Sequence, residues 1–291
     1  MECNDFIILE NASLKLTLCR PGTYYTGTRF DWAGVFRKVE CDGLVYCDEW
    51  FDGGEPSLHD HVCGPSEEFF GAAGYEQAPV GGEFMKIGVG MLQREDNGPY
   101  QRFHTYRISD GGCRGLVTDM GKALFTHCLQ GKYEYEKTVE LCSGRSFRIT
   151  HRLSNSGSDP LAVRQYNHNF FTFGLRQVGT ERSVEWDFPV QGEWREDSVN
   201  GDKNELGVSV TAPLLPGQKL FLQGIKPEKA ASGGYGFTLR AGERKVRVRS
   251  GSPMTESVLW ANDRVFCPEP YVDLNIRSSE TASWWIEYTL D

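Results

Sequence analysis

The chain has 291 residues, 24% of them charged, and a formal net charge of −9. Its lysines and arginines are scattered, which argues against a nucleic-acid partner because phosphate binding requires clustered positive charge. No stretch is apolar over the length needed to span a bilayer, so we expect no membrane partner.

The composition favours an all-β protein. Aromatic residues make up 12% of the chain, and 33 glycines and 13 prolines supply many turns. This is typical of many short strands around an aromatic-lined interior, and helical periodicity is hard to find. The length suits one large all-β domain or two ordinary domains.

The nine cysteines are an odd number and include no Cys-x-x-Cys pair. The N-terminus begins Met-Glu-Cys-Asn-Asp and lacks the basic and apolar regions of a signal peptide. We therefore expect reduced, mostly buried thiols and a cytoplasmic location.

The first predicted strands, residues 6–10 and 14–18, precede an aromatic-rich segment at residues 24–36 that contains Arg29 and Asp31. The planar donor fork of arginine suits sugar hydroxyls or a carboxylate. A surface ion pair between Arg29 and Asp31 is the alternative. A hairpin with Asp-Gly at its turn is predicted next, over residues 39–47.

Residues 48–65 have no strand period and predict a long functional loop, since aromatic and titratable side chains on a loop have no core to fill. The loop contains His59 and His61. Two histidines without a third ligand make a poor metal site, so we favour a catalytic or sugar-binding histidine. His61 is preferred, because the turn after it could present it inward, and His59 is the alternative.

Closely spaced strands separated by turn signals predict an antiparallel meander. They cover residues 123–128, 133–141 and 147–153, and two further strands are predicted before them, over residues 84–92 and 103–108. These segments carry His104, His127 and His151, which we interpret as structural or surface imidazoles.

The stretch from Tyr166 to Gly174 is the most informative part of the chain. It continues the predicted strand 161–165, so Tyr166, His168 and Phe170 share one face while Asn167 and its alternate neighbours take the other. Aromatic rings can stack on a sugar, and an imidazole can handle a hydroxyl proton near neutral pH. A core histidine satisfied by backbone groups is the alternative.

Short strands are predicted in the C-terminal part, over residues 184–188, 207–210, 220–222, 236–239 and 245–248. Residues 264–276 are interpreted as a loop, in which Glu269 stands between Pro268 and Pro270. A carboxylate on so stiff a backbone suits a fixed general base, although an exposed loop glutamate is the commoner case. A final strand is predicted at residues 282–290.

These features together resemble the aldose 1-epimerase (galactose mutarotase) superfamily. The resemblance covers most of the chain and is clearest over residues 123–174 and from Val265 onward. It implies a single domain over residues 1–291, built as a large antiparallel β-sandwich of the galactose mutarotase-like type (supersandwich). It also implies an open, polar, aromatic-lined groove and no cofactor.

The resemblance further implies roles for individual residues. Asn167 to Phe171 matches the Asn-His-x-x-Phe run of the family, which makes His168 the general acid. Glu269 corresponds to the catalytic glutamate, and a histidine of the early loop to the second histidine. That loop lacks the double glycine of the family, and the early Gly-Arg-x-x-Asn run is not matched. The expected catalytic residues are His168, Glu269 and His61. The expected substrate contacts are Arg29, His59, Glu68, Tyr166, Asn167 and Asp273, of which Asp273 is also a rival base.

The implied reaction interconverts the α and β anomers of a sugar. A base takes the anomeric proton while an acid protonates the ring oxygen, and the opened sugar rotates about one C–C bond before closing. The expected partner is a small carbohydrate, with no metal, and the protein a monomer or homodimer. The alternatives are a carbohydrate-binding or sugar-sensing protein, or a glycoside-cleaving enzyme that uses Glu67 or Glu68 opposite Glu269.

Overall fold

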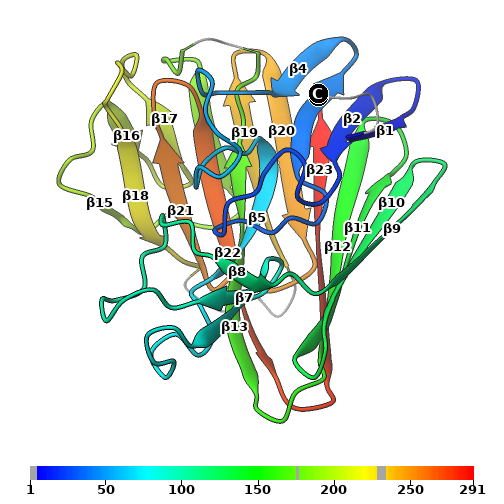
Figure 1. Cartoon of the computed structure of the whole chain (residues 1–291). Helices are drawn as coiled ribbons and strands as arrows, with labels where there is room; N and C mark the ends of the chain where they lie inside the picture. Colours follow the sequence, from blue (N-terminus) through cyan, green and yellow to red (C-terminus); the bar gives the residue numbers. More distant parts are fainter. Residues whose placement is uncertain (1–4, 175–176, 228–233) are drawn as a thin grey trace.

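The structure, a computed structural model, describes residues 5–174, 177–227 and 234–291. These residues form 23 strands in four antiparallel sheets and contain no helix, which confirms the predicted all-β class (Figure 1). It follows that no helix in the described ranges is of the length and apolarity needed to cross a membrane.

A ten-stranded sheet forms one layer. In spatial order its strands are β16 (Gly201–Lys203), β17 (Gly207–Val210), β14 (Arg182–Trp186), β19 (Tyr235–Ala241), β20 (Arg244–Ser250), β23 (Thr281–Leu290), β12 (Ser146–Asn155), β11 (Tyr133–Leu141), β10 (Lys122–Leu129) and β9 (Cys113–Asp119). Its second half contains the predicted meander: β10, β11 and β12 pair in sequence order.

A six-stranded sheet forms the facing layer. Its order is β15 (Glu193–Trp194), β18 (Leu220–Ile225), β21 (Glu256–Ala261), β22 (Phe266–Ile276), β13 (Leu161–Phe170) and β5 (Gly64–Phe70). Two smaller sheets are added to the sandwich. They consist of β1 (Phe6–Glu10), β2 (Leu14–Cys19), β3 (Phe36–Cys41) and β4 (Leu44–Cys47), and of β6 (Glu83–Lys86), β7 (Gly90–Gln93) and β8 (Ile108–Asp110).

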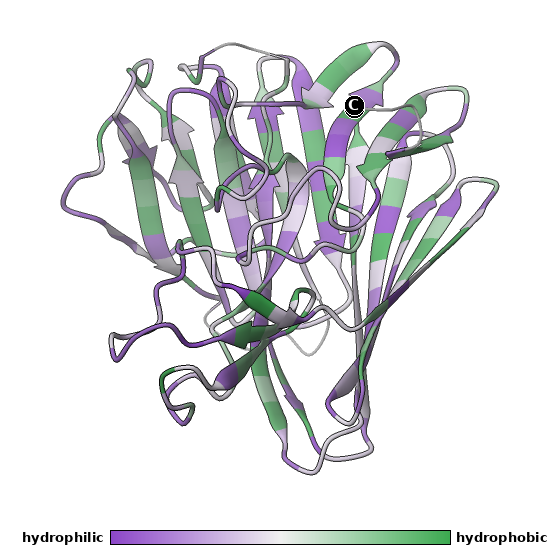
Figure 2. Cartoon of the chain, in the orientation of Figure 1, coloured by the Kyte–Doolittle hydropathy of each residue, from purple (hydrophilic) through white to green (hydrophobic). Residues whose placement is uncertain are grey.

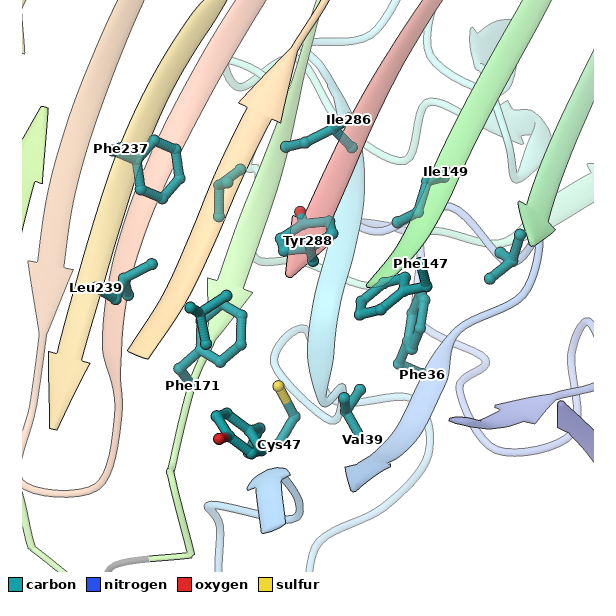
Figure 3. Packing of buried hydrophobic residues seen from close by; sticks show 14 of the residues in the cluster. Phe36, Val39, Cys47, Phe147, Ile149, Phe171, Phe237, Leu239, Ile286 and Tyr288 are labelled. Carbon is teal, nitrogen blue, oxygen red and sulfur yellow. The ribbon is translucent and has the colours of Figure 1, made fainter. Parts of the chain in front are cut away.

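The core lies between the two large sheets because their strands alternate. Along β10 and β11 every second side chain is buried, and Figure 2 shows the matching bands of polar and apolar residues. Figure 3 shows Phe147, Ile149, Ile286 and Tyr288 of the large sheet packed together with Phe36 of β3. Polar bonds also join the layers: Trp284 Nε1 donates to Gln165 Oε1 at 3.0 Å.

Charged groups are buried between the layers as well. Lys137 of β11 forms an ion pair with Glu67 of β5, and both side chains are 1% exposed. His151 Nε2 lies 3.4 Å from Glu67 Oε1, and Asn167 Nδ2 donates to the same oxygen at 3.1 Å. Burial raises the pKa of Glu67, but Lys137 and His151 outweigh it, so the pKa lies below its usual value. This cluster, which we call the interior cluster, is sealed inside the sandwich.

Two predicted elements differ in the structure. Residues 84–92 are two strands rather than one, because the chain reverses between β6 and β7 at Gly88, whose φ is +84°. Residues 103–107 belong to no strand, and only Ile108 of that predicted strand lies in β8.

The predicted loop at residues 264–276 is also wrong, since most of it is β22, an 11-residue strand in the middle of the six-stranded sheet. Proline is normally excluded from a central strand, because it has no backbone N–H group to donate to the hydrogen bonds between strands. Here β22 pairs with β13 from Tyr271 onward, and Phe266 forms a bridge to Phe171 just after β13. Between these two points β22 pairs with β21 alone. The prolines are tolerated because the two strands separate where they stand.

Candidate functional site

His168 and Glu269 face each other across the separation of β13 and β22. His168 Nε2 lies 3.3 Å from Glu269 Oε1, and both side chains are almost fully buried. The other oxygen of Glu269 accepts a hydrogen bond of 3.3 Å from the Tyr271 hydroxyl. An acid–base pair on two different strands is thereby held at hydrogen-bonding distance.

The separation of the strands is stabilised by Asn169. Its Nδ2 donates to the Pro268 carbonyl at 2.7 Å, and its Oδ1 accepts from the Tyr288 hydroxyl at 2.8 Å. The amide therefore satisfies a backbone acceptor where the pairing of the two strands is interrupted.

A cavity of about 200 Å³ opens beside this pair. Aromatic rings form much of its wall, and the His168 ring stacks on Phe170 with centroids 3.8 Å apart. Trp50 also stacks on Phe170, with ring centroids 5.2 Å apart. The lining residues are Arg29, Trp50, His59, Asp60, Arg102, Phe103, His168, Phe170, Phe221, Val258, Trp260, Glu269 and Tyr271. Such a wall suits the C–H face of a sugar, with polar groups at one end to orient it.

Burial shifts the two groups of the pair in opposite directions. It raises the pKa of Glu269 to about 7, although Arg102 and Arg29 oppose the shift. Burial lowers the pKa of His168 well below its ordinary value, and Arg29 and Arg102 lower it further. Two groups this close titrate as a pair, so near neutral pH the pair holds and loses a single proton.

A buried charge cluster adjoins the pair, centred on Glu68 of β5. Glu68 Oε2 accepts hydrogen bonds from Arg29 Nε at 2.9 Å, Arg102 Nη2 at 2.9 Å and the Tyr166 hydroxyl at 2.6 Å. Lys86 Nζ lies 3.3 Å from the other oxygen. Burial raises the pKa of Glu68, but these cations hold it far below its usual range. Glu68 is therefore an ionised anchor for the two arginines that reach the cavity.

No protein-family model matches the chain, and no curated protein matches it. Solved structures match it over nearly its whole length. The Slr1438 protein of Synechocystis sp. PCC 6803 aligns with a TM-score of 0.59 at 15% identity, over 98% of this chain and 95% of that one. A galactose mutarotase-like protein from Lactobacillus casei ATCC 334 gives 0.59 at 12% identity, over 98% and 100%. The GalM/aldose epimerase homologue from C. elegans gives 0.59 at 11%, over 98% of both chains.

The chain has the galactose mutarotase-like fold. The predicted fold type is thus confirmed. Identities of this size carry the architecture only, so the roles of individual residues rest on the geometry of the site.

Within the galactose mutarotase-like fold, the early loop supplies His59 to the cavity. His59 Nδ1 lies 3.4 Å from Arg29 Nη1, and its ring packs on Phe103 with centroids 4.5 Å apart. His61 instead packs between Tyr24 and Phe51, at 4.9 and 4.5 Å. The structure therefore brings His59, rather than the preferred His61, to His168 and Glu269.

The other predicted contacts divide between the two faces of the sheet. Tyr166 shares the cavity face with His168, as the strand period predicts, and its hydroxyl accepts from Arg29 Nη2 at 3.1 Å. Asn167 faces the interior cluster and not the cavity. Asp273, the rival base, is exposed and paired with Arg164, whose Nε lies 2.7 Å from Asp273 Oδ1. Arg29 and Asp31 form no surface pair, because Asp31 is buried and accepts from the Tyr135 hydroxyl at 3.0 Å.

Three other histidines lie outside the site, in keeping with their interpretation from sequence. His104 is half exposed beside Glu95, and His127 contacts the Tyr133 hydroxyl at 3.0 Å. His151 is buried against Trp284. In the part of the chain that is described, no three His, Cys, Asp or Glu side chains are grouped as metal ligands.

Sequence reasoning missed Arg102, which lines the cavity and pairs with Glu68. Arg102 stands between Tyr100 and Phe103 in a segment without a strand period. An arginine among aromatic residues on a loop was the one available signal. Its partner Glu68 is 34 positions away, so local spacing could not connect them.

Proposed function

We propose that the protein is an aldose 1-epimerase-like enzyme that interconverts the anomers of a sugar. The observation that carries this proposal is the His168–Glu269 pair, 3.3 Å apart at the end of an aromatic-walled cavity. Several solved structures of this fold are described as galactose mutarotase-like or as aldose epimerase homologues, which supports the same reaction class.

Mutarotation removes one proton from the anomeric hydroxyl and delivers one to the ring oxygen. The pair must therefore hold one proton and one vacant basic site at the same time. The two pKa shifts place the proton on Glu269 at rest, and the 3.3 Å contact allows it to pass to His168 Nε2. In the resulting state ionised Glu269 accepts the anomeric proton, and protonated His168 donates from Nε2 to the ring oxygen. After rotation about the C–C bond next to the opened carbonyl carbon, the two transfers reverse and the ring closes on the other face.

The glycoside-cleaving alternative requires a second carboxylate free to act on the sugar. Glu68 does not meet this requirement, because Arg29, Arg102, Lys86 and Tyr166 already occupy its oxygens. Glu67 faces the interior cluster on the other side of the sheet. A sugar-binding protein without turnover needs the aromatic wall but no acid–base pair, so His168 and Glu269 favour the enzyme.

The direct test follows the optical rotation of freshly dissolved sugars, with and without protein, against a buffer blank. We expect the protein to accelerate the approach to anomeric equilibrium for at least one sugar of a panel. Binding of sugars with no acceleration for any member of the panel would support the sugar-binding alternative instead.

The pH dependence follows from the single shared proton. The pKa of Glu269 is about 7, so the pair loses its proton as the pH rises through that value. We expect kcat/KM to be nearly constant from about pH 6 to 7 and to fall about tenfold per pH unit well above pH 7. Rates of mutarotation in buffers of constant ionic strength, corrected for the uncatalysed reaction, measure this. A rate that keeps rising to pH 9 contradicts the assignment, since it would require only a base.

The two early-loop histidines provide a matched comparison. His59→Asn is expected to lower kcat/KM about tenfold, the worth of one hydrogen bond of ~1.4 kcal/mol. His61→Asn is expected to leave kcat/KM unchanged and to lower the melting temperature, because it removes a ring packed between Tyr24 and Phe51. Steady-state rates and melting curves of both variants check this. The reverse pattern would return the role to His61.

A further inference from the structure

The charges around the cavity do not balance. Three cations, Arg29, Arg102 and Lys86, surround Glu68. The residues that line the cavity include two carboxyl groups, Glu269 and Asp60. When Glu269 holds its proton, one positive charge among these described residues therefore has no counter-charge. A protein with a net charge of −9 keeps this excess in a partly buried site, where charge is weakly screened.

The excess is presented to the cavity by guanidinium groups with donors to spare. Arg102 donates to Glu68 from Nε and Nη2, and Nη2 also donates to the Tyr166 hydroxyl, while Nη1 makes no hydrogen bond to any other described residue. Its side chain is 26% exposed. The guanidinium carbons of Arg29 and Arg102 both lie over the Phe103 ring, at 5.0 and 5.7 Å from its centroid. Both groups also donate to Glu68 Oε2 and to the Tyr166 hydroxyl, so they lie close together in the wall of the cavity.

We propose that the cavity takes acidic sugars, and that the carboxylate of a hexuronic acid binds to Arg102 and Arg29. This inference rests on the proposed function for the orientation of the sugar. A carboxylate has two oxygens and can accept a charge-assisted hydrogen bond from each of the two guanidinium groups at once. Its single negative charge also equals the unbalanced charge of the site. A phosphate dianion would leave a surplus negative charge beside Glu269.

The covalent structure of the sugar fits this placement. In a hexuronic acid pyranose the carboxylate carbon is attached to C5, the neighbour of the ring oxygen. The ring oxygen is the atom to which His168 donates, so the carboxylate must lie close to His168. Arg29 and Arg102 fit this condition, since both line the same cavity of about 200 Å³ as His168.

An acidic sugar would also prepare the catalytic pair. In addition to the effect of burial, the positive charges of Arg29 and Arg102 lower the pKa of both His168 and Glu269. A substrate carboxylate paired with the two guanidinium groups offsets their field. The pair then keeps its proton more readily, and the state in which His168 is protonated becomes more populated. A neutral sugar leaves the field in place.

Binding is tested with sugars that cannot mutarotate. Methyl glucuronide and methyl glucoside differ only at C6 and have no free anomeric hydroxyl, so calorimetry measures affinity without turnover. We expect methyl glucuronide to bind at least about tenfold more tightly, since a charge-assisted hydrogen bond contributes about 1.5–3 kcal/mol. Arg102→Gln should remove most of that preference. Arg107→Gln, at an exposed position five residues away, is the matched control and should keep it.

Turnover is measured in parallel with glucuronate, galacturonate, glucose, galactose and glucose 6-phosphate. We expect the uronates to have the highest kcat/KM. Equal affinity for the two methyl glycosides, with both arginine variants folded, overturns the inference. Tighter binding and faster turnover of glucose 6-phosphate than of glucuronate overturns the choice of a carboxylate. A preference for methyl glucuronide without turnover of any free sugar upholds the acidic-sugar site and rejects the proposed reaction.

Discussion

Glu269→Gln is expected to lower the rate of mutarotation by about 10²–10⁴-fold, the usual worth of a positioned general base. The substitution keeps the shape of the side chain but removes the carboxyl group, whose pKa is raised to about 7 by burial. The amide can still accept from the Tyr271 hydroxyl, so the local structure should persist. The measurement is kcat/KM for the best sugar of the panel, together with the affinity for its methyl glycoside, which we expect to change little.

Asp273→Asn is the matched control for Glu269→Gln. Asp273 lies four residues further along β22 but is exposed and bound to Arg164. Its removal should leave the rate unchanged. If Glu269→Gln retains the full rate while Asp273→Asn loses it, the base is Asp273. If both retain it, the pair is not the catalytic centre.

The largest expected effect on stability comes from Lys137→Met in the interior cluster. Lys137 and Glu67 are each 1% exposed, so the substitution leaves a buried carboxylate without its cation. Removing one partner of a buried ion pair typically costs about 3–5 kcal/mol. His151 and Asn167 remain within reach of the carboxylate, but burial also lowers the pKa of His151 and disfavours its charged form. Urea denaturation at pH 8 measures the loss in the free energy of unfolding.

Two further measurements separate the charge from the change in volume. Glu67→Gln combined with Lys137→Met removes both charges and should recover part of the loss. In the single variant the pKa of Glu67 is expected to rise above its unfolded value, so the carboxyl is protonated more readily in the folded state. The single variant should then lose less stability at pH 5 than at pH 8. A cost below about 1 kcal/mol at pH 8 would contradict the interior ion pair.

The sequence predicts those parts of the structure that follow from local pattern. The alternation of residues 133–141 and 147–153 predicts β11 and β12, and the strand period places Tyr166 and His168 on one face. Residues 264–276 could not be recognised as a strand. Two prolines argue against a central strand, and they are tolerated only because β13 and β22 separate there, which is a tertiary feature.

The site was predictable to the same extent. His168 and Glu269 could be named from their own segments, although the 3.3 Å between them depends on the packing of two strands about 100 residues apart. The choice between His59 and His61 was not determined by sequence. Their loop has no period, so nothing local indicates which ring turns toward Arg29 and which packs on Tyr24.

The two adjacent glutamates of β5 have a consequence for how the chain tolerates insertions and deletions. The Glu67 side chain belongs to the interior cluster, and the Glu68 side chain pairs with Arg29 on the opposite face of the sheet. A slip of β5 by one residue against β13 would exchange the two faces and leave both sets of cations without their carboxylates. Both sets of ion pairs therefore disfavour any other alignment of β5 against β13. Changes in length are expected to accumulate among residues 48–63, where they alter the rim of the cavity, and to be absent from Gly64–Phe70.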